Sequence, residues 1–288
     1  MFISVANSIV NRLTTPKVGT PVFTRPVPSE LRHSVILSSC NDVIIISGVG
    51  YTCGPPWTYP SPRLKRLIFG LIDNDRAMNE LKVSNWLATN NIPASRVVEV
   101  CKLETSELKL LDLDSSPKFP DGTSVEATAV VSTIKIPYFI KDTLCLKSSW
   151  RSAFLSYFDC TSLDNAFACF GIRLANNIRA YQLLGAVNDC LTSDSITIAG
   201  EILDFDRFLM PEADYLISGI SAARMLRQQR EFYLYLNVML DAAEMAGVTS
   251  SMLNIANFAS TNTEITLAPE CGFEIELKRF LTSGLVKK

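Results

Sequence analysis

The pattern of apolar residues changes character once along this chain of 288 residues, near Lys147. Before that point, β-rich runs such as DVIIISG and SVEATAVVSTIKIPYFI predict strands. After it, apolar residues recur every three or four positions, which is the spacing of an amphipathic helix. Because the two kinds of element are segregated and do not alternate, we predict an α+β fold with a β-rich N-terminal half and a helical C-terminal half.

Two long helices account for most of the second half. Ser162 is a suitable N-cap, and the helix that it begins carries one apolar stripe: Leu163, Phe167, Phe170, Leu174, Ile178, Tyr181 and Leu184. A second run extends from Pro211 to Gly247, with proline at its start and glycine after its end, as helices prefer. Its last part, EFYLYLNVMLDAAEMAG, is apolar on almost every side, so we expect a central, buried helix there.

The two ends of the chain differ from its middle. Four prolines in residues 1–31 oppose a helix, and the basic residues Arg12, Lys17 and Arg25 have no acidic residue beside them up to position 29, so we predict an extended N-terminal arm. Near the other end, FEIELKRFL alternates after the turn APECG, which predicts a terminal β-hairpin. The predicted regions are therefore the arm at 1–31, a β-rich region at 32–147 and a mainly helical region at 148–288. The last two regions could share one core.

Cysteine usage and hydropathy bear on the compartment. The chain has eight cysteines but no C-x-x-C pair, so we expect no structural zinc site. Its start lacks the basic segment of a signal peptide, and no apolar run approaches the ~20 residues that span a bilayer. We therefore expect reduced, mostly buried thiols and a cytoplasmic or virion-like location.

Histidine occurs once, at His33, which removes the usual general base and the commonest metal ligand. Other catalytic motifs are also weak. The glycines of GVGYTCG precede prolines where a dinucleotide loop needs a helix. The Ser-x-x-Lys matches at Ser106/Lys109 and Ser132/Lys135 are attributed to chance, and nothing brings the carboxylate pairs together. The pairs are Asp73/Asp75, Asp112/Asp114 and Asp204/Asp206. We predict no catalytic residue, no cofactor and no metal.

Candidate contact residues come from two groups. Arginines on the two long helices could line a groove for phosphates together with the arm, although a solvated face is the alternative. The members of this set are Arg12, Lys17, Arg25, Arg173, Arg179, Arg224, Arg227 and Arg230. Tyr51, Trp57 and Tyr59 lie in a proline-rich loop, where they would fill a subunit interface or cover the chain's own core.

Composition favours an interaction protein over an enzyme. Charged residues make up 19% of the chain against the usual ~25%, and interface cores are depleted in charge. We therefore predict a non-enzymatic, self-associating structural protein, a subunit of a capsid, nucleocapsid or matrix-like shell. Its partners would be further copies of itself and RNA or other shell proteins. Two alternatives stay open: an enzyme that works without histidine, and a monomeric binding or adaptor module.

Overall fold

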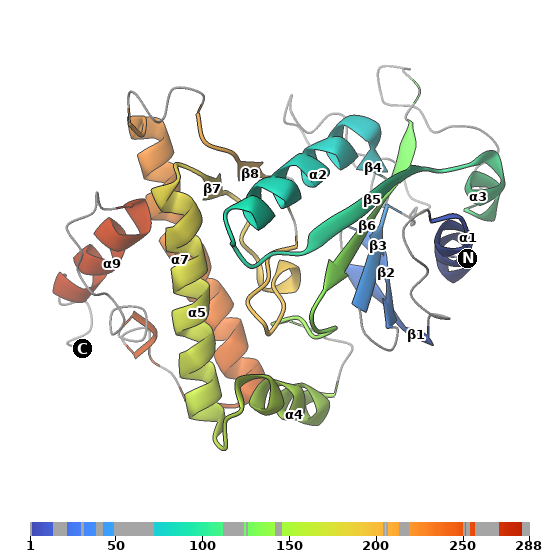
Figure 1. Cartoon of the computed structure of the whole chain (residues 1–288). Coiled ribbons are helices and arrows are strands. Elements are labelled where there is room, and N and C mark those ends of the chain that lie inside the picture. Colours follow the sequence, from blue (N-terminus) through green and yellow to red (C-terminus); the bar gives the residue numbers. More distant parts are fainter. Residues whose placement is uncertain are drawn as a thin grey trace. The chain divides into compact units, whose positions relative to one another are not determined.

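The computed structural model is a mixed helix and strand fold (Figure 1). It describes residues 2–13, 22–29, 32–38, 43–48, 72–111, 124, 126–141, 146–203, 205, 207–212, 219–249, 251, 254–256 and 271–283. The chain divides into two compact units. Unit 1 comprises Met1–Asn85 with Ser95–Pro137, and unit 2 comprises Trp86–Ala94 with Tyr138–Lys288.

Unit 1 is built on an antiparallel sheet in which β3 and β6 are central. The strand order is β1-β2-β3-β6-β4, and β5 also pairs with β6. The strands are β1 (Val22–Ser29), β2 (Arg32–Ser38), β3 (Val43–Ser47), β4 (Ile72–Asp73), β5 (Arg96–Lys102) and β6 (Ala127–Ile134). Ile44, Ile45 and Ile46 are all buried, so β3 is covered on both faces, as its unbroken apolar run predicts.

Three helices accompany this sheet: α1 (Phe2–Arg12), α2 (Asn74–Thr89) and α3 (Thr105–Leu110). The predicted extended arm is wrong over Phe2–Arg12, because this segment is helical. Val5, Ala6 and Ile9 form its inner stripe, are fully buried and join the core beneath β3, β5 and β6. Asn11 is exposed on the opposite face, and the prolines begin only after the helix has ended.

The rest of the predicted arm is described only in part. Its residues 22–29 form β1, which pairs with β2 as a hairpin. Lys17 lies outside the described residues, and so does the side chain of Arg25.

Unit 2 is mainly helical. Its helices are α4 (Lys147–Phe158), α5 (Leu163–Leu183), α7 (Ala222–Ala246) and α9 (Gly272–Thr282), with the short strands β7 (Val187–Asn188) and β8 (Phe208–Leu209) and the 3-10 turn η1 (Ser193–Ser195). Helices α5 and α7 pack together, and α9 packs on α7 (Figure 1). The first long predicted helix is confirmed, with Ser162 capping α5. The second is confirmed from Ala222 to its end, where Gly247 takes a left-handed conformation, but its predicted start at Pro211 is wrong, because Ser221 caps α7 and Pro211 is not helical.

The predicted terminal hairpin is wrong, because Gly272–Thr282 is the helix α9. The five residues FEIEL fit both an alternating and a helical pattern. In the structure Phe273, Glu276 and Leu277 are buried while Ile275 is partly exposed, which is the helical spacing. Contact with α7 therefore decides the conformation that the local pattern leaves open.

Two further sequence expectations can be compared with the described residues. No helix in the described part of the chain is long and apolar enough to cross a membrane. The five described cysteines are free: Cys101 and Cys271 are buried, Cys160 and Cys190 are partly exposed, and Cys169 is exposed.

Candidate functional site

The segment from Val187 to Leu203, called here the polar loop, begins with β7, contains η1 and lies between α5 and β8 in unit 2. Loops generally lie at the surface, because their polar backbone needs water. In the polar loop, however, five polar residues are buried: Asn188, Ser193, Ser195, Thr197 and Glu201. Their burial requires internal hydrogen-bond partners, which the neighbouring helices provide.

Glu231 of α7 is the central partner. Its side chain is fully buried, and three donors reach its carboxyl group. The Tyr181 hydroxyl and the Asn188 backbone N–H donate to Oε1, the latter at 3.2 Å, and Gln182 Nε2 donates to Oε2 at 2.8 Å. Burial dominates these hydrogen bonds and raises the pKa of Glu231 to about 8.

Two glutamines extend this network to the start of α9. Gln228 Nε2 donates to the carbonyl oxygens of Gln182 and Ala186, at 2.8 and 3.0 Å. The Gln228 side-chain oxygen accepts from the backbone N–H of Gly272 at 3.1 Å, and that of Gln182 accepts from Phe273 at 2.8 Å. The first N–H groups of a helix have no partner within it, so α5 and α7 cap α9 with their side chains. The polar loop therefore rests on a base to which three helices contribute.

The 3-10 turn in the polar loop is anchored separately. The Ser193 hydroxyl donates to the Asp241 carboxylate on α7, and Lys141 lies 3.7 Å from the same carboxylate. The Lys141 backbone N–H also donates to the Ser193 carbonyl at 3.0 Å. Asp194, in the middle of this turn, is exposed. A fixed turn thus presents one carboxylate to solvent.

The beginning of the polar loop carries a second carboxylate. Asp189 forms an ion pair with Arg227 of α7. The preceding Asn188 accepts a hydrogen bond from the Cys190 backbone at 3.0 Å, while its buried Nδ2 has no partner in the described part of the chain. Within the described residues, no group of three histidine, cysteine or acidic side chains could hold a metal ion. The groups available for chemistry are therefore single carboxylates and hydroxyls.

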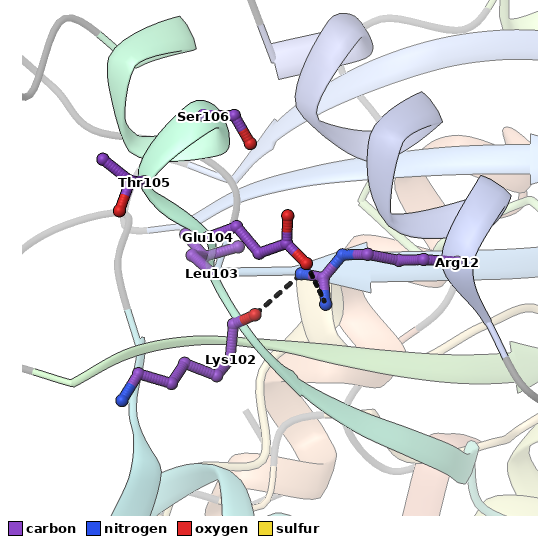
Figure 2. Close-up of a pocket in the computed structure, with 6 residues that line it drawn as sticks. All are labelled: Arg12, Lys102, Leu103, Glu104, Thr105 and Ser106. Atoms are coloured by element: carbon purple, nitrogen blue, oxygen red, sulfur yellow. Dashed lines mark hydrogen bonds and ion pairs between the residues drawn. The ribbon is translucent and has the colours of Figure 1, made fainter.

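Unit 1 contains a surface hollow of about 620 Å³ lined by Arg12, Lys102, Leu103, Glu104, Thr105 and Ser106 (Figure 2). Arg12 is committed to internal contacts there. Its guanidinium donates to the Glu107 carboxylate at 2.6 and 3.0 Å and to the Lys102 carbonyl at 2.7 Å. Burial acts to raise the pKa of Glu107, but hydrogen bonds from Arg12 and the Glu104 backbone outweigh it and lower that pKa. Arg12 therefore joins α1 to α3 in this structure.

Of the five other described arginines predicted for phosphate contact, four meet another side chain and one is exposed. Arg173 lies over the Tyr157 ring at 5.5 Å, and Arg179 is buried with its Nε 3.3 Å from Glu274. Arg224 lies 3.8 Å from Glu212, Arg227 pairs with Asp189, and Arg230 is exposed. Their proposed role in phosphate contact stays a prediction.

Several residues considered in the sequence cannot be placed. The predicted interface residues Tyr51, Trp57 and Tyr59 lie outside the described residues, as do Asp112, Asp114, Asp204 and Asp206. The first glycine of GVGYTCG, Gly48, has a φ of +84°, which is consistent with a tight turn after β3.

Sequence reasoning missed the polar loop and the residues that support it. A usable signal was Glu231 at the start of the run EFYLYLNVMLDAAEMAG, because a carboxylate in a helix that is apolar on almost every side must be buried with partners. Gln182, close to the apolar stripe of α5, was a second signal. The partners themselves could not be found from spacing.

No family model and no curated protein matches the sequence of this chain. Solved structures show a weak similarity of fold. The M. tuberculosis PknI kinase domain has 9% identity and a TM-score of 0.36, with coverage of 92% of this chain and 88% of that chain. A Neurospora crassa PAN3 pseudokinase mutant has 13% identity and a TM-score of 0.35, covering 93% and 61% respectively. A Ralstonia eutropha protein named as a candidate aminoglycoside phosphotransferase has 7% identity and a TM-score of 0.31, covering 97% and 94%.

These findings contradict the predicted shell subunit and the prediction that the chain is not an enzyme. The expected self-assembly into a virion-like particle is wrong with it. The error in the physical reasoning was to take a single histidine as evidence against an enzyme. Some group-transfer reactions use positioned carboxylates and need no histidine. A low fraction of charged residues also fits a globular chain that buries much of its surface, so it does not by itself indicate self-association. The predicted partners stay untested predictions.

Proposed function

We propose that this chain is an enzyme of the phosphotransferase class that works without histidine and acts through the polar loop. The observation that carries the proposal is the fully buried Glu231, which holds the Asn188 backbone and so fixes the loop that bears Asp189 and Asp194. Buried polar networks are costly unless every member is paired, and perturbed carboxyl groups gather at functional sites. The proposal rests on this geometry and not on the weak similarity of fold.

Phosphoryl transfer suits the groups that the polar loop offers. Its transition state requires little covalent chemistry from the protein, and catalysis consists mainly of positioning and electrostatic stabilisation. A carboxylate can accept the proton of the attacking hydroxyl. Asp194 fits that role best, because it is exposed on a turn fixed by Ser193, Asp241 and Lys141. Asp189 is already paired with Arg227.

A divalent cation would accompany a nucleotide in such a reaction. Magnesium keeps several waters and is commonly held by one or two carboxylates together with substrate phosphates. In the polar loop Asp194 is assigned to the acceptor hydroxyl and Asp189 is paired with Arg227, so substrate phosphates and water would supply most of the cation's ligands. The cation would neutralise phosphate charge, while the loop itself would position the acceptor hydroxyl.

Nucleotide binding and phosphate transfer test the proposal separately. The full chain is mixed with ATP or GTP with and without Mg²⁺, and its melting temperature and its transfer of γ-labelled phosphate to protein and small hydroxyl acceptors are measured. We expect a magnesium-dependent rise in Tm of a few degrees near saturation. Asp194→Asn should reduce transfer by at least about 100-fold, the usual contribution of a general base.

Asp164→Asn is the matched control, because Asp164 is also exposed in unit 2 but lies in the first turn of α5. It should leave transfer within about twofold of the unaltered protein. Failure of every nucleotide to shift Tm, together with no transfer, would show the proposal to be wrong. Binding without transfer would instead favour the alternative of a binding module.

A further inference from the structure

Two buried glutamines connect α5 to α7. They are Gln182 of α5 and Gln228 of α7. Each side-chain amide donates to the backbone carbonyl of the other residue: Gln182 Nε2 to the Gln228 oxygen at 3.1 Å, and Gln228 Nε2 to the Gln182 oxygen at 2.8 Å. Because of these reciprocal bonds, neither amide can rotate without losing a hydrogen bond to the neighbouring helix.

The side-chain oxygens of both glutamines bind the start of α9. Gln228 Oε1 accepts from the Gly272 N–H at 3.1 Å, and Gln182 Oε1 accepts from the Phe273 N–H at 2.8 Å. These two N–H groups lie in the first turn of α9, where a helix has no acceptor of its own for them. A rotated amide would direct its NH2 group at another donor, so the docked α9 fixes the orientation of both amides.

The side-chain nitrogens of the same glutamines hold the chain where the polar loop begins. Gln228 Nε2 also donates to the Ala186 carbonyl at 3.0 Å. Gln182 Nε2 donates to Glu231 Oε2 at 2.8 Å, and Glu231 Oε1 accepts from the Asn188 N–H at 3.2 Å. A continuous series of hydrogen bonds therefore joins the first turn of α9 to the polar loop.

Displacement of α9 would leave two buried oxygens without donors. An unpaired buried acceptor is costly, so each amide would rotate or admit water. Rotation of the Gln182 amide would turn its oxygen toward the Glu231 carboxyl group and remove the donor at Oε2. Glu231 would then no longer be held in the orientation that binds the Asn188 backbone. The order of the polar loop at its start therefore depends on the position of α9.

We propose that α9 is a regulatory element of the polar loop and that Gln182 is the positioning residue that connects them. While the first turn of α9 is docked, Gln182 and Glu231 hold the Asn188 backbone in place. Displacement of α9 releases Asn188, and with it the next residue, Asp189. This coupling is a property of the fold and holds whether or not the polar loop transfers phosphate.

Hydrogen exchange in the unaltered full chain tests the coupling without any substitution. Exchange of assigned backbone amides is followed by NMR at graded urea concentrations below the unfolding transition, which gives the free energy of the opening that exposes each amide. We expect the Asn188 N–H to be exposed in every opening that exposes the amides of α9. If the Asn188 N–H stays protected after α9 has opened, the proposal is overturned.

Substitutions test the route through Gln182. Leu277→Ala removes a buried side chain from α9 and should accelerate exchange of the Asn188 N–H at least about tenfold. In Gln182→Met, which has a side chain of similar length without the amide, Leu277→Ala should change that exchange rate by less than about twofold, because the connection is already broken. Equal acceleration with and without the Gln182 amide would overturn the proposal.

Phe154→Leu is the control for a general loss of stability. Phe154 is fully buried in α4 and contacts Phe170 of α5, and no hydrogen bond of the glutamine network involves it. It should leave exchange of the Asn188 N–H within about twofold of the unaltered protein. If Leu277→Ala does not fold, Glu274→Gln replaces it, since this change weakens the 3.3 Å ion pair of α9 with Arg179. Faster exchange in α9 without faster exchange at Asn188 would overturn the proposal with either variant.

Discussion

At the scale of single residues, we expect the buried Glu231 to make the stability of unit 2 depend on pH. It is fully buried, and the groups that face it are the Tyr181 hydroxyl, the Gln182 amide and the Asn188 N–H, with the negative charge of Asp189 nearby. Burial raises its pKa from 4.5 to about 8. Between these values the folded protein holds a proton that the unfolded chain has released, so stability falls as pH rises. The stability that protonation of Glu231 contributes to the folded protein is fully present below pH 4.5 and is lost as pH rises through about 8.

Glu231→Gln removes this titration. The variant should lose about 1–3 kcal/mol of unfolding free energy at pH 6. Its amide NH2 group would face another hydrogen-bond donor, either Gln182 Nε2 or the Tyr181 hydroxyl and the Asn188 N–H. Its stability should then change less between pH 5 and pH 8 than that of the unaltered protein. Urea unfolding at several pH values measures both effects. Glu244→Gln, at a side chain that is 74% exposed, should keep the original pH slope. An unchanged slope in Glu231→Gln would contradict the assignment.

At the scale of elements, the long helices could be predicted and the short ones could not. In α5 the stripe from Phe167 to Tyr181 repeats often enough to exclude an alternating strand, and Ser162 marks its start. In α9 the pattern is too short to decide. Its helical start depends on the Gln182 and Gln228 side chains, which accept from Phe273 and Gly272 across 91 and 44 positions of the chain. Such distant capping residues cannot be recognised from the local sequence of α9.

The close approach of α9 to α7 also makes a prediction. A Cβ added at Gly272 would lie 2.7 Å from the Gln229 backbone nitrogen, so a backbone would have to move. Gly272→Ala should therefore cost about 1–3 kcal/mol in unfolding free energy. Gly171→Ala is the control, because there the added Cβ meets the flexible Met239 methyl at 2.6 Å and gains helix propensity. Chemical denaturation of both variants measures the difference. Equal stability would mean that α9 packs less closely than described.

At the scale of the whole molecule, the candidate site lay beyond sequence reasoning because its parts are distant. Glu231 reaches Asn188 across 43 positions, and Ser193 reaches Asp241 across 48. Composition also misled, since a single histidine was taken as evidence against catalysis, although the chain contains many carboxylates, Asp189 and Asp194 among them. The proposed boundary between residues 147 and 148 stays a prediction.

The N-terminal segment distinguishes the predicted extended arm from the helix α1 that the structure shows. An extended arm could be removed without affecting the core, whereas α1 places Val5, Ala6 and Ile9 in that core, each fully buried. Its Arg12 also pairs with Glu107, whose side chain has no exposed surface. Removing residues 2–12 should therefore lower Tm and expose unit 1 to proteases, because three buried side chains and one buried ion-pair partner are lost together.

Point substitutions keep this test informative if the shortened chain fails to fold. Ile9→Ala should cost about 2–5 kcal/mol, as truncation of a fully buried isoleucine usually does. Asn11→Ala, on the exposed face of the same helix, should change stability by no more than about 0.5 kcal/mol. Urea unfolding measures both. If Ile9→Ala is as stable as Asn11→Ala and the shortened chain melts like the full one, α1 contributes nothing to the core and the arm interpretation would be restored.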